Sequence, residues 1–201
     1  MSKIKLYFLT GFLGSGKTTL ANILAKFYEI PTGKIFFNDI DINDIERKSF
    51  YEKFAYVMQD DYIYDNTIKH NIELYKNYEK NEVKEATKKA ELFDTIEKLD
   101  KKYDTLIGDN GIKLSGGQKQ RLILSRNLIT NPNILIIDNG FTGLDIDTRK
   151  KVIDNLNNRN NKATLVIISS MMEDIKNADK IYKLENKTLV EINMEEEVYD
   201  A

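Results

Sequence analysis

The hydrophobic residues of this chain follow two kinds of pattern. Short continuous apolar runs are typical of buried strands, whereas apolar residues that recur every three or four positions are typical of helices with one buried face. Strands are predicted over the runs Ile4–Leu9, Lys34–Asn38, Phe54–Gln59, Ile134–Asp138, Thr164–Ser169, Ile181–Leu184 and Thr188–Ile192. Helices are predicted over Thr18–Tyr28, a segment capped by Asp65, Asn66 and Thr67 that ends at Leu74, a longer segment capped by Asn81, Gly116–Thr130, Asp147–Asn158 and Met172–Asn177.

These strands and helices alternate along most of the chain, which implies a parallel sheet with right-handed crossovers. In such sheets ligands bind beyond the carboxyl ends of the strands. The stretch from Asp65 to Asp109 differs because it is charged and helical, and we predict that it is an insertion in an α/β domain. Four apolar residues of this stretch share one helix face, which indicates core packing rather than a ligand site. They are Val83, Ala86, Ala90 and Phe93.

Composition and charge narrow the class of protein. The 201 residues are 41 % hydrophobic and 31 % charged, so they can form one globular domain, with or without an inserted subdomain. A net charge of −2 argues against a nucleic-acid binder, which usually carries a basic face. The absence of cysteine excludes disulfides and thiolate metal sites. We find no signal peptide and no apolar run near the ~20 residues of a membrane helix, so we expect any membrane part elsewhere.

The segment Gly11–Thr18 matches the phosphate-binding loop G-x-x-x-x-G-K-[ST], and a predicted strand and helix flank it as that loop requires. Glycines are needed where a Cβ would keep backbone N–H groups away from phosphate oxygens. Lys17 is then placed to reach the β and γ phosphates, and the Thr18 hydroxyl to bind Mg²⁺. The start of the following helix adds partial positive charge. The pattern therefore predicts a nucleotide-binding site.

A second glycine-rich motif, Leu114–Gln118, opens the helix predicted to begin at Gly116. A hydroxyl group and two glycine N–H groups at a helix start form a further anion-binding position. Because one site holds only one γ-phosphate, we interpret this second position as serving a nucleotide held by another subunit. The alternative is a helix-capping Ser-Gly-Gly turn without a ligand.

These two motifs, together with further short phrases along the chain, resemble the ATP-binding domain of ABC transporters. The resemblance covers essentially the whole chain, and the exporter branch is the most similar. The further phrases are Phe27–Ile35, the Q-loop Tyr56–Asp60, Asp65–Ile72, Tyr103–Thr105 with Gly108, the Walker B strand Ile134–Asp138, the D-loop Gly143–Asp145 and Ala178–Ile181. The resemblance implies an α/β fold, with a P-loop NTPase three-layer core, a mostly parallel sheet and an inserted α-helical subdomain. It places the core at residues 1–62 and 116–201 of a single domain, and the insertion at 63–115.

The resemblance also implies roles for individual residues. Residues that hold the ATP triphosphate are Gly11, Gly14, Ser15, Gly16, Lys17, Thr18 and Thr19. Signature residues that contact the ATP of a facing subunit, in a head-to-tail dimer, are Ser115, Gly116, Gly117 and Gln118. Mg²⁺ is implied at Thr18, Gln59 and Asp138, and Gln59 and Asp145 are implied catalytic positions. A membrane-spanning partner is implied at the cytoplasmic face, docked beside Gln59 and the helical insertion.

Two catalytic positions depart from the family pattern. The residue after Asp138 is expected to be the glutamate that polarises the attacking water, and here it is Asn139, whose amide cannot accept a proton at neutral pH. Ser170 occupies the position of the switch histidine and has neither its reach nor its charge option. The sole histidine, His70, is expected at the surface of the insertion. The family's domain normally begins upstream with a β-subdomain that stacks on adenine, whereas this sequence starts almost at the first core strand. We therefore expect that adenine is held weakly, or that those strands come from another chain or from a part missing from this sequence.

These departures suggest a division of labour between two subunits. We hypothesise that the chain's own phosphate loop holds ATP with little turnover, whereas its intact signature completes a working site on a different partner, which favours a heterodimer over a homodimer. Simple decay or deliberate disabling by mutation is the alternative, so the sequence leaves open whether the chain is an active ATPase.

A soluble ATP-gated interaction module is a second class of function, although we do not see the tandem domains, coiled coils and basic surfaces that are usual there. The start Leu9–Gly14 also looks like a metal-chaperone GTPase, but the cysteine motif and guanine-reading tetrapeptide of that family are missing.

Overall fold

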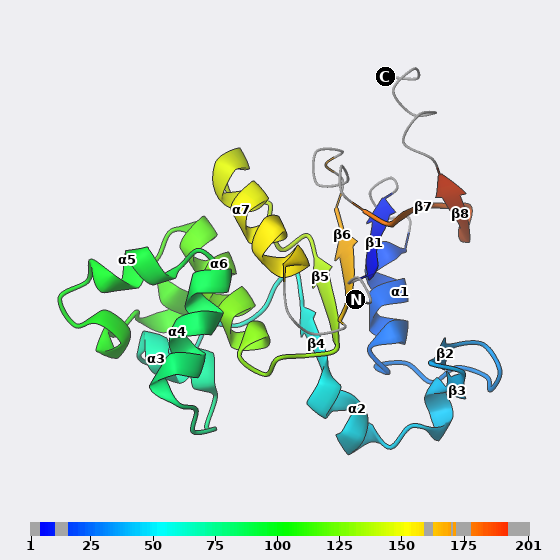
Figure 1. Ribbon diagram of the computed structural model, residues 1–201, viewed down its shortest axis with the longest axis horizontal. Coiled ribbons are helices and arrows are strands. Elements are labelled where there is room, and N and C mark those ends of the chain that lie inside the picture. The colour runs from blue at the N-terminus through cyan, green and yellow to red at the C-terminus, as the bar shows by residue number, and fades with distance from the viewer. Residues whose placement is uncertain (1–4, 11–15, 159–162, 170, 172–177, 193–201) are drawn as a thin grey trace. The chain divides into compact units, whose positions relative to one another are not determined.

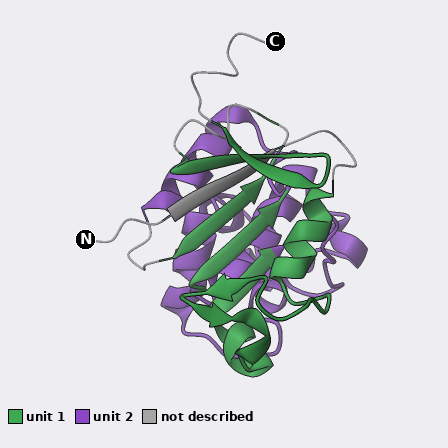
Figure 2. Cartoon of the chain, turned by 90° about the vertical axis from the view of Figure 1, so that its right-hand side faces the viewer, with its two compact units in different colours: residues 1–56, 132–138, 161–201 green, residues 57–131, 139–160 purple. Residues whose placement is uncertain are grey.

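The computed structural model describes residues 5–10, 16–158, 163–169, 171 and 178–192 (Figure 1). The chain divides into two compact units (Figure 2). The first comprises residues 1–56, 132–138 and 161–201, and the second comprises residues 57–131 and 139–160. Within the described residues, no helix is long and apolar enough to cross a membrane.

A six-stranded sheet organises the first unit (Figure 2). Its strands, in spatial order, are β4 (Phe54–Val57), β5 (Ile134–Asp138), β6 (Thr164–Ile168), β1 (Lys5–Thr10), β7 (Lys180–Glu185) and β8 (Thr188–Ile192). The strands β5, β6, β1 and β7 are parallel, and β8 is antiparallel to β7. This arrangement confirms the predicted α/β fold with a mostly parallel sheet.

Helix α1 (Lys17–Leu24) covers one face of this sheet. Ala21 and Ala25 are completely buried against residues of the sheet, among them Ile136 and Ile168. The helix ends before the predicted Tyr28 because Lys26 adopts a positive φ of 58°. The Lys26 ammonium group donates hydrogen bonds to the carbonyl oxygens of Ile42 and Ile45, at 2.6 and 2.7 Å, and so fixes the chain after the helix.

The segment between α1 and β4 differs most from the sequence prediction. The predicted strand Lys34–Asn38 is reduced to β2 (Phe36–Phe37), which pairs with β3 (Ile40–Asp41) in a short antiparallel hairpin. A 3₁₀ turn, η1 (Ile42–Asp44), and the unpredicted helix α2 (Arg47–Lys53) follow. The aromatic rings of this helix explain its stability, because Phe50 stacks on Phe54 with ring centroids 4.7 Å apart.

The second unit is helical. Its elements are α3 (Ile68–Glu73), α4 (Lys80–Lys89), α5 (Phe93–Glu97), η2 (Lys102–Asp104), η3 (Asp109–Gly111), α6 (Gly116–Leu128) and α7 (Ile146–Asn157). The unit therefore contains the predicted insertion and also α6 and α7. The domain boundaries deduced from the resemblance stay a prediction.

Two local predictions for this unit are wrong. The cap of α4 is Glu79, which forms a capping box with Glu82, so Asn81 lies inside the helix. Val83, Ala86 and Ala90 are buried as predicted, but Phe93 begins α5 instead of continuing α4. Its ring lies beneath the Lys84 and Lys88 ammonium groups, at 5.1 and 5.8 Å. Thr67 caps α3 as predicted, because its hydroxyl oxygen accepts a hydrogen bond from the His70 N–H.

The only histidine, His70, lies in a row of aromatic side chains with the exposed Tyr64 and Tyr75. The His70 ring is partly buried. It meets the ring of Tyr75 edge-on at 4.9 Å and that of Tyr64 at 6.4 Å.

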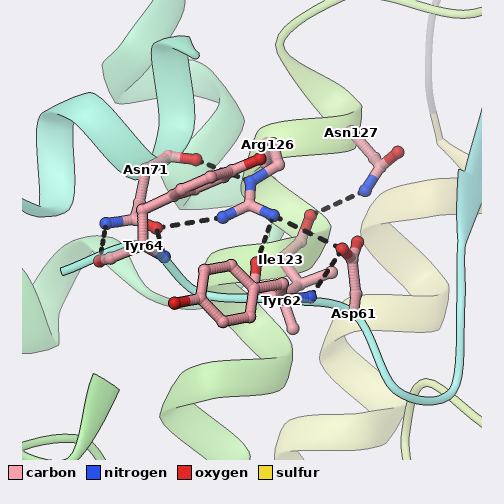
Figure 3. A network of polar contacts seen from close by, with 7 residues as sticks. All are labelled: Asp61, Tyr62, Tyr64, Asn71, Ile123, Arg126 and Asn127. Atoms are coloured by element: carbon pink, nitrogen blue, oxygen red, sulfur yellow. Dashed lines mark hydrogen bonds and ion pairs between the residues drawn. The ribbon is translucent and has the colours of Figure 1, made fainter. Parts of the chain in front are cut away.

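A buried arginine connects three segments of the second unit (Figure 3). Arg126 of α6 donates from Nε to the carbonyl oxygen of Asn71 and from Nη2 to the Asn71 side-chain oxygen, at 2.7 and 3.0 Å. Its Nη1 donates to the carbonyl oxygen of Tyr62 at 2.7 Å and lies 3.5 Å from Asp61 Oδ1. Burial lowers the pKa of Arg126 and raises that of Asp61, and the attraction between the two charges opposes both shifts. The segment that follows Gln59 is thereby fixed to α3 and α6.

Candidate nucleotide-binding site

The end of the predicted phosphate loop lies at the start of α1. Gly16 has a φ of 95°, a conformation that residues with a Cβ rarely adopt, and it is the N-cap of the helix. Lys17, Thr18 and Thr19 form the first turn, where backbone N–H groups have no helical carbonyl partner. Such a turn is suited to a phosphate group. Gly11, Gly14 and Ser15 of the predicted loop lie outside the described residues.

The carboxylate of Asp138 stands at the carboxyl end of β5 and is fully buried. Its Oδ2 accepts a hydrogen bond from the Thr18 hydroxyl at 2.7 Å and another from the Tyr56 hydroxyl at 3.3 Å. Its Oδ1 is buried without a hydrogen-bond partner among the described residues. Burial lowers the pKa of Lys17, and the negative charge of Asp138 acts in the opposite direction. The structure thus brings together the predicted Thr18 and Asp138 and adds Tyr56.

These oxygens fit a Mg²⁺ ion. A buried carboxylate oxygen without a donor is costly unless a cation or another donor faces it. Mg²⁺ prefers hard oxygen ligands and is usually held by one or two protein carboxylates or hydroxyls together with water and substrate phosphates. Thr18 and Asp138 would hold it, and the ion would neutralise charge on the phosphates. Gln59, the third predicted ligand, belongs to the other compact unit.

Gln59 and Asn139 contact each other within the second unit. The Asn139 side-chain Nδ2 donates a hydrogen bond to Gln59 Oε1 at 3.1 Å. Asn139 has a φ of 50°. The residue at the predicted base position therefore acts as a hydrogen-bond donor toward the Q-loop glutamine.

The signature residues begin α6 with a capping box. The Ser115 hydroxyl oxygen accepts from the Gln118 N–H at 3.3 Å, and Gln118 Oε1 accepts from the Ser115 N–H at 2.9 Å. Ser115 and Gly116 are exposed, and a Cβ on Gly116 would meet open space. A Cβ on Gly117 would lie only 2.6 Å from the Gly143 carbonyl oxygen. Gly117 is thus required by close contact with the D-loop.

Sequence reasoning missed a residue that joins the signature helix to the D-loop. Gln120 Oε1 accepts a hydrogen bond from the Gly143 N–H at 2.8 Å, and its Nε2 donates to the Thr142 hydroxyl at 2.9 Å. The signal was available, because Gln120 lies one helical turn beyond Gly116 and so on the same face as the start of the motif.

Asp145, a predicted catalytic residue, has a local role in the fold. It is the N-cap of α7, and its Oδ1 accepts a hydrogen bond from the Thr148 N–H at 2.9 Å. That hydrogen bond lowers the pKa of Asp145 below its ordinary value. Ser170 lies outside the described residues.

Comparison with known proteins gives a consistent result. The model of the ABC transporter family matches residues 1–142. The chain belongs to the ABC transporter family. It is 39 % identical over 91 % of its length to the beta-(1→2)glucan export ATP-binding/permease protein NdvA of Bartonella bacilliformis, and 35 % identical over 95 % of its length to the ATP-dependent lipid A-core flippase of Pasteurella multocida. These matches cover 31 % and 33 % of the two relatives, so the chain spans about a third of their length.

A solved structure agrees with this assignment. The ATP-bound structure of a bacterial Atm1-family ABC exporter resembles the chain with a TM-score of 0.86 and 32 % identity, over 92 % of this chain and 33 % of that one. The chain is therefore an ABC nucleotide-binding domain of the exporter kind, and it has the P-loop NTPase fold that the sequence predicted.

Proposed function

We propose that this domain powers an exporter by binding Mg²⁺-ATP at an interface with a second ABC domain, while a membrane-spanning partner supplies the transport path. The observation that carries the proposal is the pair formed by Thr18 and Asp138, beside the start of α1. It offers a hydroxyl group, a buried carboxylate oxygen that receives no hydrogen bond among the described residues, and the first turn of a helix, which are the groups that suit Mg²⁺ and a phosphate chain. As a part of such an exporter, the domain works at the cytoplasmic face of the membrane. Nucleic acid is not among its partners.

The chain's own site turns ATP over slowly in this proposal. Catalysis requires a group that accepts a proton from the attacking water, and the Asn139 amide instead donates to Gln59 Oε1. The loss of a positioned base typically costs about 10²–10⁴ in rate. Ser170, at the switch position, supplies no imidazole. Binding is preserved, because a neutral amide does not repel the γ-phosphate.

The signature motif serves the partner's nucleotide in this proposal. The exposure of Ser115 and Gly116 supports it, because a group that grips a phosphate held by another subunit must face outward. An intact signature and an altered base on one chain favour a heterodimer whose partner carries the glutamate. ATP then holds the two domains together, and hydrolysis in the partner's site lets them separate.

Turnover by the purified chain tests the proposal. We expect the chain to bind Mg²⁺-ATP and to hydrolyse it barely above background, and we expect the Asn139→Glu, Ser170→His double variant to hydrolyse it faster. Lys17→Ala is the control, because it removes the phosphate-binding ammonium group and is expected to abolish binding. Rapid hydrolysis by the unmodified chain would refute the slow site, and absence of nucleotide binding would refute the proposed function as a whole.

A further inference from the structure

The tyrosine that begins the Q-loop phrase Tyr56–Asp60 touches the candidate metal ligand. Tyr56 lies in β4, three residues before Gln59. It is buried in the cluster that contains Ala21 of α1, Ala25 at the end of that helix and Ile136 of β5. The packing directs its hydroxyl group to the carboxyl end of β5, where it lies 3.3 Å from Asp138 Oδ2. Tyr56, Asp138 and the residues of this cluster all belong to the first compact unit.

The two oxygens of Asp138 have different surroundings as a result. Oδ2 receives two hydroxyl groups, those of Thr18 and Tyr56, whereas Oδ1 receives no hydrogen bond among the described residues although it is buried. A carboxylate held by only one hydroxyl group could rotate about χ2, which is a broad torsion. With two donors on Oδ2, rotation of the carboxylate would break two hydrogen bonds. The direction of Oδ1 is therefore fixed as well.

The Tyr56 hydroxyl group remains a donor at neutral pH. A tyrosine hydroxyl group keeps its proton at neutral pH, because the pKa of a phenol is about 10. A neutral hydroxyl group facing a carboxylate donates its proton to it.

We propose that Tyr56 is a positioning residue for Mg²⁺: its hydroxyl group fixes the Asp138 carboxylate so that Oδ1 is presented to the ion. The inference rests on the proposed function, since Mg²⁺ accompanies the nucleotide there. Tyr56 touches neither ion nor nucleotide, and it acts through Asp138. Residues that orient a metal ligand by a hydrogen bond commonly contribute about 10- to 100-fold to metal affinity.

The test compares nucleotide affinity with and without Mg²⁺. The dissociation constant of ATPγS is measured for the full chain by calorimetry in excess Mg²⁺ and again in EDTA. For Tyr56→Phe, which removes only the hydroxyl group, we expect the Mg²⁺-dependent gain in affinity to fall about tenfold, at the lower end of that range, while the EDTA value stays within twofold of the unmodified chain.

Tyr51→Phe is the matched control. The Tyr51 hydroxyl group also donates a hydrogen bond in the first unit, to the Ala25 carbonyl oxygen at 2.9 Å, but it does not contact Asp138. We expect Tyr51→Phe to keep the full Mg²⁺ dependence. Folding is checked by circular dichroism, and Tyr56→Met, which fills the site without a hydroxyl group, replaces Tyr56→Phe if the latter does not fold.

The outcomes separate this inference from the proposed function. If Tyr56→Phe keeps the Mg²⁺ dependence of the unmodified chain, or loses affinity equally with and without Mg²⁺, the inference is overturned and nucleotide binding stands. If the unmodified chain binds ATPγS with no dependence on Mg²⁺, the inference is likewise overturned. If the unmodified chain binds no nucleotide, the proposed function is overturned together with it.

Discussion

Neighbouring glycines in the signature motif have different reasons to be glycine. Gly117 packs against the Gly143 carbonyl oxygen, whereas Gly116 faces open space, and neither has a positive φ. The requirement at Gly117 is therefore one of space and not of backbone conformation. The sequence showed two adjacent glycines and gave no reason to treat them differently.

Substitution by alanine should separate the two positions. Gly117→Ala would place a Cβ 2.6 Å from a backbone oxygen, so we expect a loss of about 1–3 kcal/mol in the free energy of unfolding. Gly116→Ala is the matched control, and because alanine is the better helix former we expect no loss and a gain of up to about 1 kcal/mol. Urea unfolding of both variants measures the difference. Equal effects of the two substitutions would contradict the steric argument.

At the scale of single elements, helix starts were easier to predict than helix ends. The cap Thr67 was predicted from its side chain and Ser115 was considered as one, although the predicted cap Asn81 lies inside α4 and Asp145, the cap of α7, was predicted only as a catalytic residue. The end of α1 depends on Lys26, whose ammonium group reaches carbonyl groups of residues 42 and 45, and no local pattern shows that contact. Helix α2 was missed for a similar reason, because its Phe50 packs on Phe37 of the preceding hairpin, with ring centroids 5.6 Å apart, and the local sequence does not show that contact.

The site was predictable to a similar degree. The motifs identified Thr18 and Asp138, which the structure brings together. Tyr56 and Gln120 were missed, because their hydrogen bonds reach residues 82 positions away in one case and 22 to 23 in the other. Side-chain contacts over such separations are set by the fold, and the sequence indicates only that Gln120 shares a helix face with the start of the signature motif.

The cap of α7 should make stability depend on pH. The pKa of Asp145 is lowered in the folded chain, so its contribution is fully present above the unfolded pKa of about 4 and is lost as the pH falls through the folded value. Asp145→Asn retains an acceptor for the Thr148 N–H but has no charge to titrate. We expect the difference in urea midpoint between the unmodified chain and this variant to be constant near neutral pH and to shrink at acid pH. A difference that persists unchanged at pH values below the folded pKa would disprove the assignment.

The Arg126 network should be among the most sensitive contacts of the second unit. Arg126→Met leaves Asp61 buried without its cation and removes the donors to Asn71 and Tyr62, so we expect a loss of about 3–5 kcal/mol in the free energy of unfolding. Asn127→Ala is the control, since the Asn127 side chain bonds only within its own helix, to the Ile123 carbonyl oxygen. We expect the control to cost less than about 1 kcal/mol, as measured by urea unfolding. A similar loss in both variants would show that the Arg126 network contributes no more to the free energy of unfolding than a hydrogen bond within one helix.

At the scale of the whole molecule, the candidate phosphate-binding start of α1 and the signature motif lie in different compact units of one chain. The proposed dimer requires that the two bind different nucleotides. The sequence motifs and the family favour two separate nucleotides. Ligand binding to the isolated chain can test this, because only the first motif should then respond.

Hydrogen exchange should report the two motifs separately. At concentrations at which light scattering shows a monomer, we expect Mg²⁺-ATP to slow exchange at the first turn of α1, around residues 16–20, and to leave residues 115–118 unchanged. Protection of 115–118 should appear only at concentrations at which ATP drives association, with or without an added partner domain. Mass spectrometry of peptides from both segments, with light scattering in parallel, provides the measurement. Protection of 115–118 in the monomer would mean that both motifs serve one nucleotide.

The backbone conformation of Asn139 affects how easily a catalytic glutamate could occupy this position. At a φ of 50°, Asn139 lies in the left-handed region, which asparagine adopts more readily than glutamate does. Replacement by glutamate would therefore bring a proton acceptor and, in the same step, a backbone penalty of about 1 kcal/mol. A descendant of this chain that gained a glutamate here would have to accept that penalty or change the conformation of the turn.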